Sequence, residues 1–229
     1  MRIGILALLL SFNVLATEKV DDVITFSGND FFAINTEYND SLGDRFIEKV
    51  LTLEGNKLYV YFDSPGGSIL PMMRMIETMR VEKHIKFICV ARMAASAAFM
   101  TFQHCHERYL LPDGILMSHN AAGSFQGELP RVRTMLDVIE GLLDPVERRV
   151  ARRLKLSFRD YKEAINNNMW LNSLTAGKMN AIDDIITGVS CTKETVETSV
   201  KSTETVRTLF GQATVEVTKT ACPILNKTF

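Results

Sequence analysis

The sequence predicts an α/β fold, because short apolar segments alternate with stretches of helical periodicity along most of its 229 residues. Residues 58–62 are an unbroken apolar run and residues 85–90 are apolar except for Lys86, as expected of strands that are buried on both faces of a sheet. The glycine pair Gly66-Gly67 ends the first run abruptly, which indicates a tight join between a strand and a helix. A sandwich or an all-helical bundle fits these observations less well.

The elements follow in order from this pattern. The predicted strands are residues 20–26, 31–34, 58–62, 85–90, 108–111 and 114–119. The predicted helices are residues 42–51, 69–79, 96–104 and a long segment after Gly127. Ser68 can cap the second helix, whose methionine stripe is expected to pack in the core. Asp144-Pro145 is expected to kink or divide the long helix, since proline lacks the N–H donor that a helix interior needs.

Composition excludes several classes of protein. The 46% hydrophobic content is ample for a core, so collagen-like and disordered chains are disfavoured. The 26 Lys and Arg residues balance 27 Asp and Glu residues, and a net charge of -1 gives no general attraction to nucleic acid. We expect no nucleic-acid partner. The basic residues between Arg148 and Lys155 are expected to form a solvated helix face rather than a site for an acidic partner.

The first sixteen residues resemble a secretory signal peptide. One positive charge at Arg2 precedes an apolar stretch, and Ala16 ends a segment that a signal peptidase could cleave. The stretch is shorter than the roughly 20 apolar residues of a spanning helix, which disfavours an uncleaved anchor. We therefore expect an exported protein, periplasmic or secreted, with residues 1–16 as signal peptide, 17–190 as the main domain and 191–229 as a Thr-rich C-terminal extension.

Export makes disulfide bonds possible for the four cysteines. Cys191 and Cys222 bracket the Thr-rich extension, and Cys89 and Cys105 would be the remaining pair. Four cysteines allow three connectivities, and the sequence does not choose among them. For Cys89, inside a buried strand, we favour a small buried hydrophobic residue over a bridge. The alternation at residues 213–218 predicts a strand within the extension.

Two strand-to-helix turns carry the candidate chemistry. Ser96 lies where the strand 85–90 gives way to a helix, a geometry that exposes a nucleophilic hydroxyl beside free backbone N–H groups. Twenty-nine residues earlier, the turn around Gly66 and Gly67 can aim further N–H groups at a developing oxyanion. Small residues beside Ser96 are also common where a helix merely packs on a sheet. Together, however, the two turns predict an anion hole beside a nucleophile.

A general base is needed at the same edge of the sheet, and His119 ends the strand 114–119 that follows the serine helix. Isolated histidines more often serve as hydrogen-bonded scaffold than as catalysts. The other three, His84, His104 and His106, lie in charged or turn-like surroundings. The tripeptide His104-Cys105-His106 could bind a metal, but adjacent residues are not spaced for one face, so we expect no metal and no other cofactor.

These motifs, in this order, resemble those of the ClpP family of serine peptidases within the ClpP/crotonase-like fold. The resemblance runs from residue 34 to residue 186. It rests on Asp63-Ser64-Pro65-Gly66-Gly67-Ser68, Met93-Ala94-Ala95-Ser96, Met117-Ser118-His119, Phe125-Gln126-Gly127 before a long helix, and the segments 170–173 and 181–183. The family implies a repeated β-β-α spiral with a long handle helix, to which this chain adds its C-terminal segment.

The resemblance also implies roles for individual residues. Ser96 would be the nucleophile, His119 the base and then the acid, and the N–H groups of Gly67 and Ala97 the oxyanion hole. The third catalytic position falls on Asn168, where the family usually has aspartate. An amide oxygen can orient an imidazole but cannot neutralise the imidazolium. We therefore expect reduced activity and a higher rate in Asn168→Asp.

Two alternatives at the third catalytic position stay open: Asp160 or Asp183 could act in place of Asn168, or the enzyme could be a relic. The leading hypothesis is an exported serine endopeptidase that acts on peptides or unfolded proteins. A signal-peptide peptidase of the SppA type is less favoured because it uses a serine-lysine pair, and a crotonase-type acyl-CoA enzyme because of the export signal. A catalytically weakened ring that serves as a binding scaffold is the alternative that is not an enzyme. The resemblance implies a homo-oligomer, and export would separate it from an ATPase partner.

Overall fold

The computed structural model describes residues 23–208, 211–222 and 224. The signal peptide predicted at residues 1–16 lies outside the described residues. The strands are β1 (Val23–Phe26), β2 (Phe31–Ile34), β3 (Lys57–Ser64), β4 (Lys86–Ala95), β5 (Glu107–Ser118), β6 (Met169–Asn172), β7 (Asp184–Ile185), β8 (Gly188–Cys191), β9 (Ser199–Thr208) and β10 (Gly211–Thr220). The helices are α1 (Asp40–Leu51), α2 (Ile69–Val81), α3 (Ala97–Phe102), α4 (Leu129–Arg153), α5 (Phe158–Asn166), α6 (Ser173–Lys178) and α7 (Lys193–Glu197).

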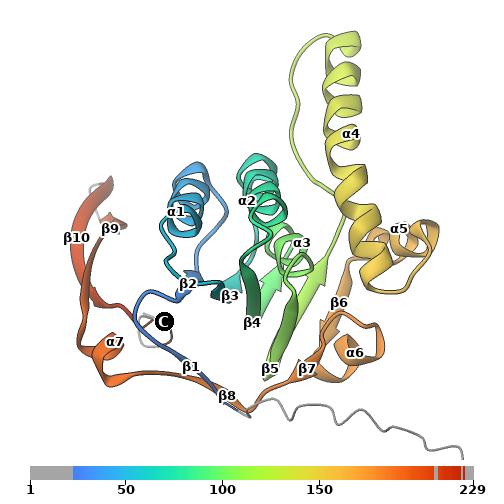
Figure 1. The fold of residues 1–229 in the computed structure, drawn as a ribbon. Coiled ribbons are helices and arrows are strands. Elements are labelled where there is room, and N and C mark those ends of the chain that lie inside the picture. Colours follow the sequence, from blue (N-terminus) through green and yellow to red (C-terminus); the bar gives the residue numbers. More distant parts are fainter. Residues whose placement is uncertain (1–22, 209–210, 223, 225–229) are drawn as a thin grey trace, which may run out of the picture.

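A six-stranded sheet organises the main domain. Its order is β2-β3-β4-β5-β6, and β7 adds to β5. The pairs from β2 to β5 are parallel, whereas β6 runs antiparallel to β5. Helices α1, α2 and α3 lie along one face of this sheet, and α4 projects away from it (Figure 1). This mixed α/β architecture agrees with the fold that the resemblance implied.

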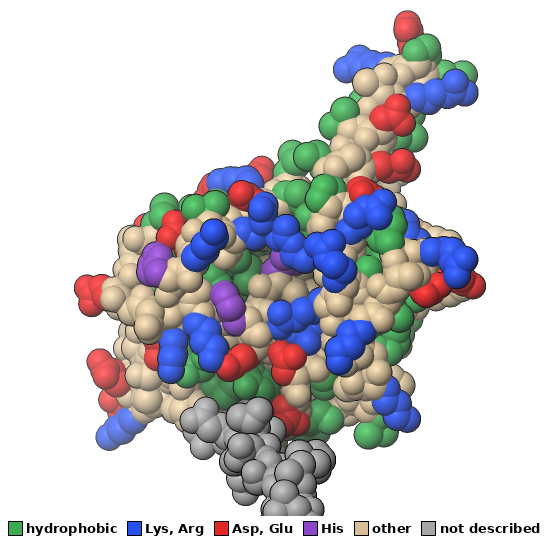
Figure 2. Space-filling model, turned by 45° about the vertical axis from the view of Figure 1, so that its right-hand side comes forward, with side chains coloured by type: hydrophobic (Ala, Val, Ile, Leu, Met, Phe, Trp, Pro, Cys, Tyr) green, Lys and Arg blue, Asp and Glu red, His purple; other side chains and the backbone are tan. Residues whose placement is uncertain are grey.

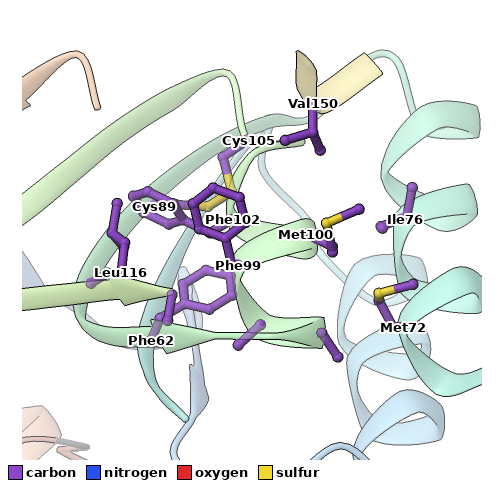
Figure 3. Close-up of a cluster of buried hydrophobic side chains, with 14 of the residues drawn as sticks. Phe62, Met72, Ile76, Cys89, Phe99, Met100, Phe102, Cys105, Leu116 and Val150 are labelled. Atoms are coloured by element: carbon purple, nitrogen blue, oxygen red, sulfur yellow. A yellow bond between two sulfur atoms is a disulfide. The ribbon is translucent and has the colours of Figure 1, made fainter. Parts of the chain in front are cut away.

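The larger core lies between the sheet and these helices. Alternate residues of β3 and β4, including Phe62 and Phe87, point into it and are fully buried. Helix α3 is buried over its whole length. Figure 3 shows its Phe99 and Phe102 among side chains from β3, α2 and α4. A buried α3 fixes the position of the residue that precedes it, Ser96.

The opposite face of the sheet is covered by the two ends of the domain. Strand β1 pairs in parallel with β8, and Ile24 and Phe26 of β1 pack on Tyr61 and Ile88 of the sheet. The sheet is therefore buried on both faces, which explains the apolar runs in its strands.

Both cysteine pairs are bonded: Cys89 to Cys105, and Cys191 to Cys222. The expectation that Cys89 is only a buried hydrophobic residue was wrong. Cys89 is indeed fully buried, but Cys105 is buried opposite it at the end of α3, at a Cα–Cα distance of 6.0 Å. Tertiary structure, which the sequence pattern does not describe, brings the two together.

Two further expectations needed correction. Helix α4 is not divided at Asp144-Pro145 but continues through the proline, because buried Leu143, Val146 and Val150 on both sides of it hold the two halves on the core. The strands predicted at 108–111 and 114–119 are one strand, β5, whose register with β4 shifts between Ala91 and Met93. The strand predicted at 213–218 is confirmed within the β9–β10 hairpin. Among the described residues, none of the helices has both the length and the apolar composition to cross a bilayer.

Candidate active site

Ser96 stands between β4 and α3 in a conformation that few residues other than glycine adopt. Its φ is 55° and its ψ is -120°. Such strain persists only where the surrounding structure imposes it, and it is common at active sites. Ser96 is the N-cap residue of α3, yet its hydroxyl makes no capping hydrogen bond. The hydroxyl is therefore free to bond elsewhere.

His119 follows the last residue of β5 and meets this hydroxyl. The distance from His119 Nε2 to Ser96 Oγ is 2.7 Å. With the ring proton on Nδ1, Nε2 accepts the hydrogen bond that Ser96 donates. The preceding residue, Ser118, is buried and bonds Tyr161 of α5 at 3.0 Å. This bond anchors the end of β5 and so helps to position His119.

The glycine turn after β3 packs directly on the serine turn. At Gly66, with φ of 97°, an added Cβ would lie 2.5 Å from the carbonyl oxygen of Ala95 and 2.7 Å from Ser96 Cβ. At Gly67, with φ of 141°, an added Cβ would lie 2.6 Å from the backbone nitrogen of Tyr38. Only glycine fits at either position without displacing backbone: Gly66 is required by the close approach of the two turns, and Gly67 by the close approach of Tyr38.

This packing brings backbone donors to the serine. Tyr38 holds the glycine turn from the other side: its N–H donates to Gly66 O at 2.7 Å, and its C=O accepts from Ser68 N at 2.9 Å. In the described part of the chain, the N–H groups of Gly67 and Ala97 have no bonded acceptor. Unpaired N–H groups beside a nucleophile are what an oxyanion hole provides. No sequence motif pointed to Tyr38, because its role depends on a distant turn.

Asn168 reaches the neighbourhood of His119 through the antiparallel pairing of β5 with β6. Ser118 is paired with Met169, so one further step of the register puts His119 opposite Asn168. Asn168 has a φ of 54° and an exposed side chain. Among the described residues, its amide makes no hydrogen bond to the His119 ring. The fold therefore aligns the backbone of the third catalytic position without completing the side-chain contact.

The two alternative carboxylates are engaged elsewhere. Asp183 accepts three hydrogen bonds from Arg108, at 2.7, 2.9 and 3.2 Å, and Arg108 is itself buried. Burial raises the pKa of Asp183, but these bonds and the Arg108 charge outweigh it and lower the pKa overall. Asp160 is paired with Arg159 at 3.5 Å on the surface of α5. Across the described ranges, neither carboxylate bonds His119.

In the tripeptide that was considered as a metal site, residues 104–106, Cys105 is bonded to Cys89. No group of three or more potential metal-ligating side chains is found in the part of the chain that the structure describes. His106 instead accepts a hydrogen bond through Nδ1 from Phe87 N at 3.0 Å. It therefore serves to tie β5 to the start of β4.

The family model described as Clp protease matches residues 17–189. The match covers well over half of the chain, and the chain belongs to the Clp protease family. Members of this family are generally oligomeric peptidases, and membership supports a serine-peptidase kind of function.

Proposed function

We propose that this protein is an exported serine endopeptidase that hydrolyses peptides or unfolded proteins through an acyl-enzyme on Ser96. The observation that carries the proposal is the 2.7 Å contact between Ser96 Oγ and His119 Nε2, made by a serine in strained backbone geometry. The family match supports the peptidase class.

In the proposed mechanism, His119 Nε2 takes the proton of Ser96 as Oγ attacks the scissile carbonyl. The carbonyl oxygen becomes an oxyanion, which accepts hydrogen bonds from the N–H groups of Gly67 and Ala97. As the C–N bond breaks, His119 returns the proton to the leaving amine and the acyl-enzyme remains. Water, deprotonated by His119, then releases the acid product and restores Ser96.

Asn168 sets the expected rate. Loss of the triad carboxylate in a serine protease lowers turnover by about 10⁴-fold. We therefore propose a slow peptidase in which His119 acts with little help in stabilising its charged form. If the remaining rate is negligible, a binding scaffold becomes the better description, and the missing contact between Asn168 and His119 is the observation that favours it.

Export is supported by the charged and apolar start of the sequence together with the two disulfide bonds. Disulfides persist in oxidising compartments and are rare in a reducing cytosol. The periplasm or the cell exterior would provide such conditions.

Assembly with further copies is supported by helix α4. The helix projects from the body of the domain (Figure 1), and several of its apolar side chains are exposed. These are Leu129, Met135, Leu136, Val138 and Leu142. Apolar residues exposed along a projecting helix are typical of a surface that another subunit covers. We propose a homo-oligomer formed in part through this helix.

The decisive experiment is labelling of the purified protein with a fluorophosphonate, with the adduct located by mass spectrometry. We expect labelling at Ser96 that is lost in Ser96→Ala and strongly reduced in His119→Ala. Ser68→Ala is the matched control, because Ser68 holds the equivalent N-cap position of α2 and likewise makes no side-chain capping bond. Near-UV circular dichroism confirms that each variant is folded. Absence of labelling in the folded wild-type protein would replace the peptidase proposal with the scaffold.

A further inference from the structure

A second concave site lies at the opposite end of α3 from Ser96. It is a pocket of ≈ 520 Å³, within the usual size range of small-molecule sites. Its cationic lining residues are Arg80, Lys83, Arg149, Arg152 and Arg153. Figure 2 shows Lys and Arg side chains gathered on one face of the molecule, with His side chains among them. Three of the basic residues of α4, Arg149, Arg152 and Arg153, thus line this pocket.

The positive charge of this pocket is only partly compensated. Arg80 pairs with Glu77, and Arg153 lies 3.6 Å from Asp183. Within the described ranges, no carboxylate lies within ion-pair distance of the other three cations, Lys83, Arg149 and Arg152. Burial, followed by the charges of Arg80 and Arg152, lowers the pKa of Arg149, and the smaller effect of the Glu77 charge opposes this. The fold thus holds cations together against their mutual repulsion, which an anion would relieve.

His104 provides a second and independent indication of a ligand. It lines the same pocket, and its Nδ1–H donates to Met100 O at 2.7 Å. Its Nε2 is buried and, among the described residues, has no hydrogen-bond partner. Because Nδ1 carries the proton of the neutral ring, Nε2 is an acceptor without a donor. Buried polar atoms nearly always have a hydrogen-bond partner, so we expect a bound ligand to donate a hydrogen bond to Nε2.

We propose that this pocket binds a phosphate group in a protonated form, with the arginines contacting its charged oxygens and His104 Nε2 accepting a hydrogen bond from its P–OH. A ligand that needs both negative charge for the arginines and an O–H donor for His104 Nε2 belongs to a narrow class of anions. Arginine favours phosphate and sulfate alike, but at neutral pH only phosphate still offers an O–H donor. A single phosphate leaves much of the pocket unfilled, so the ligand is either free phosphate or the phosphate of a larger molecule; a phosphate monoester, whose second pKa is about 6, would bind as its monoanion, the form that keeps a P–OH.

Isothermal titration calorimetry at pH 7 and constant ionic strength tests the proposal, with inorganic phosphate and sulfate as probes. We expect phosphate to bind at least tenfold more tightly than sulfate. Arg149→Gln should weaken phosphate binding at least tenfold. Arg148→Gln is the matched control and should leave it unchanged, because Arg148 is the neighbouring residue but pairs with Asp144 at 2.6 Å. Titrations with glycerol 3-phosphate and with vesicles of phosphatidic acid in phosphatidylcholine distinguish a soluble source from a lipid headgroup.

The variant His104→Asn removes the hydrogen-bond acceptor Nε2 and leaves the positive charge of the arginines in place. The asparagine amide can still donate toward Met100 O but has no group in the place of Nε2. We expect this variant to lose the preference for phosphate over sulfate and to keep binding to both. The proposal is overturned by the absence of phosphate binding at 10 mM, by binding that Arg149→Gln does not change, or by equal affinity of the wild-type protein for the two anions. Because Ser96→Ala should bind phosphate as the wild type does, the test is independent of peptidase activity.

Discussion

Helix α3 separates two sites that are built in different ways. At its N-terminal end, backbone geometry makes the site: the strained Ser96, the glycine turn packed on it, and two N–H groups, of Gly67 and Ala97, that have no acceptor among the described residues. At its C-terminal end, side chains from three separate segments make the site, and arginines dominate it. The first end suits a reaction in which negative charge develops for a moment, whereas the second suits an anion that carries its charge permanently. One buried helix thus presents two kinds of anion recognition.

The largest effect on peptide hydrolysis should come from removing the general base, His119. His119→Ala should lower peptide hydrolysis by about 10²- to 10⁴-fold, since that is the usual contribution of a general acid-base group. Phosphate binding at the other end of α3 should not change. Steady-state kinetics and calorimetry on the same sample test both statements. A loss at both ends would mean that the two sites are not separate.

Gly66→Ala should damage the first end through geometry alone. The new Cβ would lie 2.7 Å from Ser96 Cβ and 2.9 Å from the nitrogen of Ala97. A displacement of about 1 Å at a catalytic group can lower a rate roughly 10²-fold, and we expect a loss of that order. Gly123→Ala is the control, because its nearest atoms are 3.4 Å away on the Phe125 ring. Equal rates for the two variants would contradict the proposed packing of the turns.

A lower pH should destabilise the protein through His104, at the C-terminal end of α3. Burial is the main cause that lowers the pKa of His104 to about 4; the hydrogen bond to Met100 O opposes it, and the charges of Arg149, Arg153 and Arg80 lower the pKa further. The unfolded chain takes up this proton below about pH 6.5, whereas the folded protein resists it until about pH 4.

The free energy of unfolding should therefore fall between pH 7 and pH 5, by about 2 kcal/mol from this residue. Urea denaturation at the two pH values measures the fall, and His104→Asn should show a smaller one. An identical fall in the variant would contradict the assignment to His104.

Asn168→Asp should give the smallest effect, and it acts at the first end. A carboxylate opposite His119 would stabilise the imidazolium, but the side chain at this position is exposed and must turn toward the ring. We expect about a tenfold increase in hydrolysis, well below the 10⁴-fold value of a fully engaged carboxylate. The measurement is kcat/KM on a peptide substrate. Unchanged turnover would remove residue 168 from the catalytic set.

The sequence was informative where structure depends on local pattern. The glycine turn, the serine turn and the strand before His119 are contiguous motifs, so their chemistry could be recognised before the structure was known. The 2.7 Å contact between Ser96 and His119 agrees with that interpretation.

The sequence was less informative where distant segments meet. The phosphate pocket combines Arg80 of α2 with Arg149 of α4, and no spacing rule joins residues so far apart. The bond between Cys89 and Cys105 depends on how α3 folds back on β4. The continuity of α4 through Pro145 depends on core packing that outweighs a local cost of about 3 kcal/mol.

The pairing of β1 with β8 affects the order in which the chain can fold during synthesis. Thr25 of β1 bonds Ser190 of β8, 165 positions later in the sequence. During synthesis, β1 therefore has no pairing partner until β8 has been made. At about 5 to 20 residues per second, the delay is roughly 8 to 33 s. Until β8 is made, β1 lacks the strand that pairs with it, and its Ile24 and Phe26 pack with Tyr61 and Ile88 in the finished cluster. For those seconds, the sheet face on which β1 and β8 pack is not yet assembled in the newly synthesised chain.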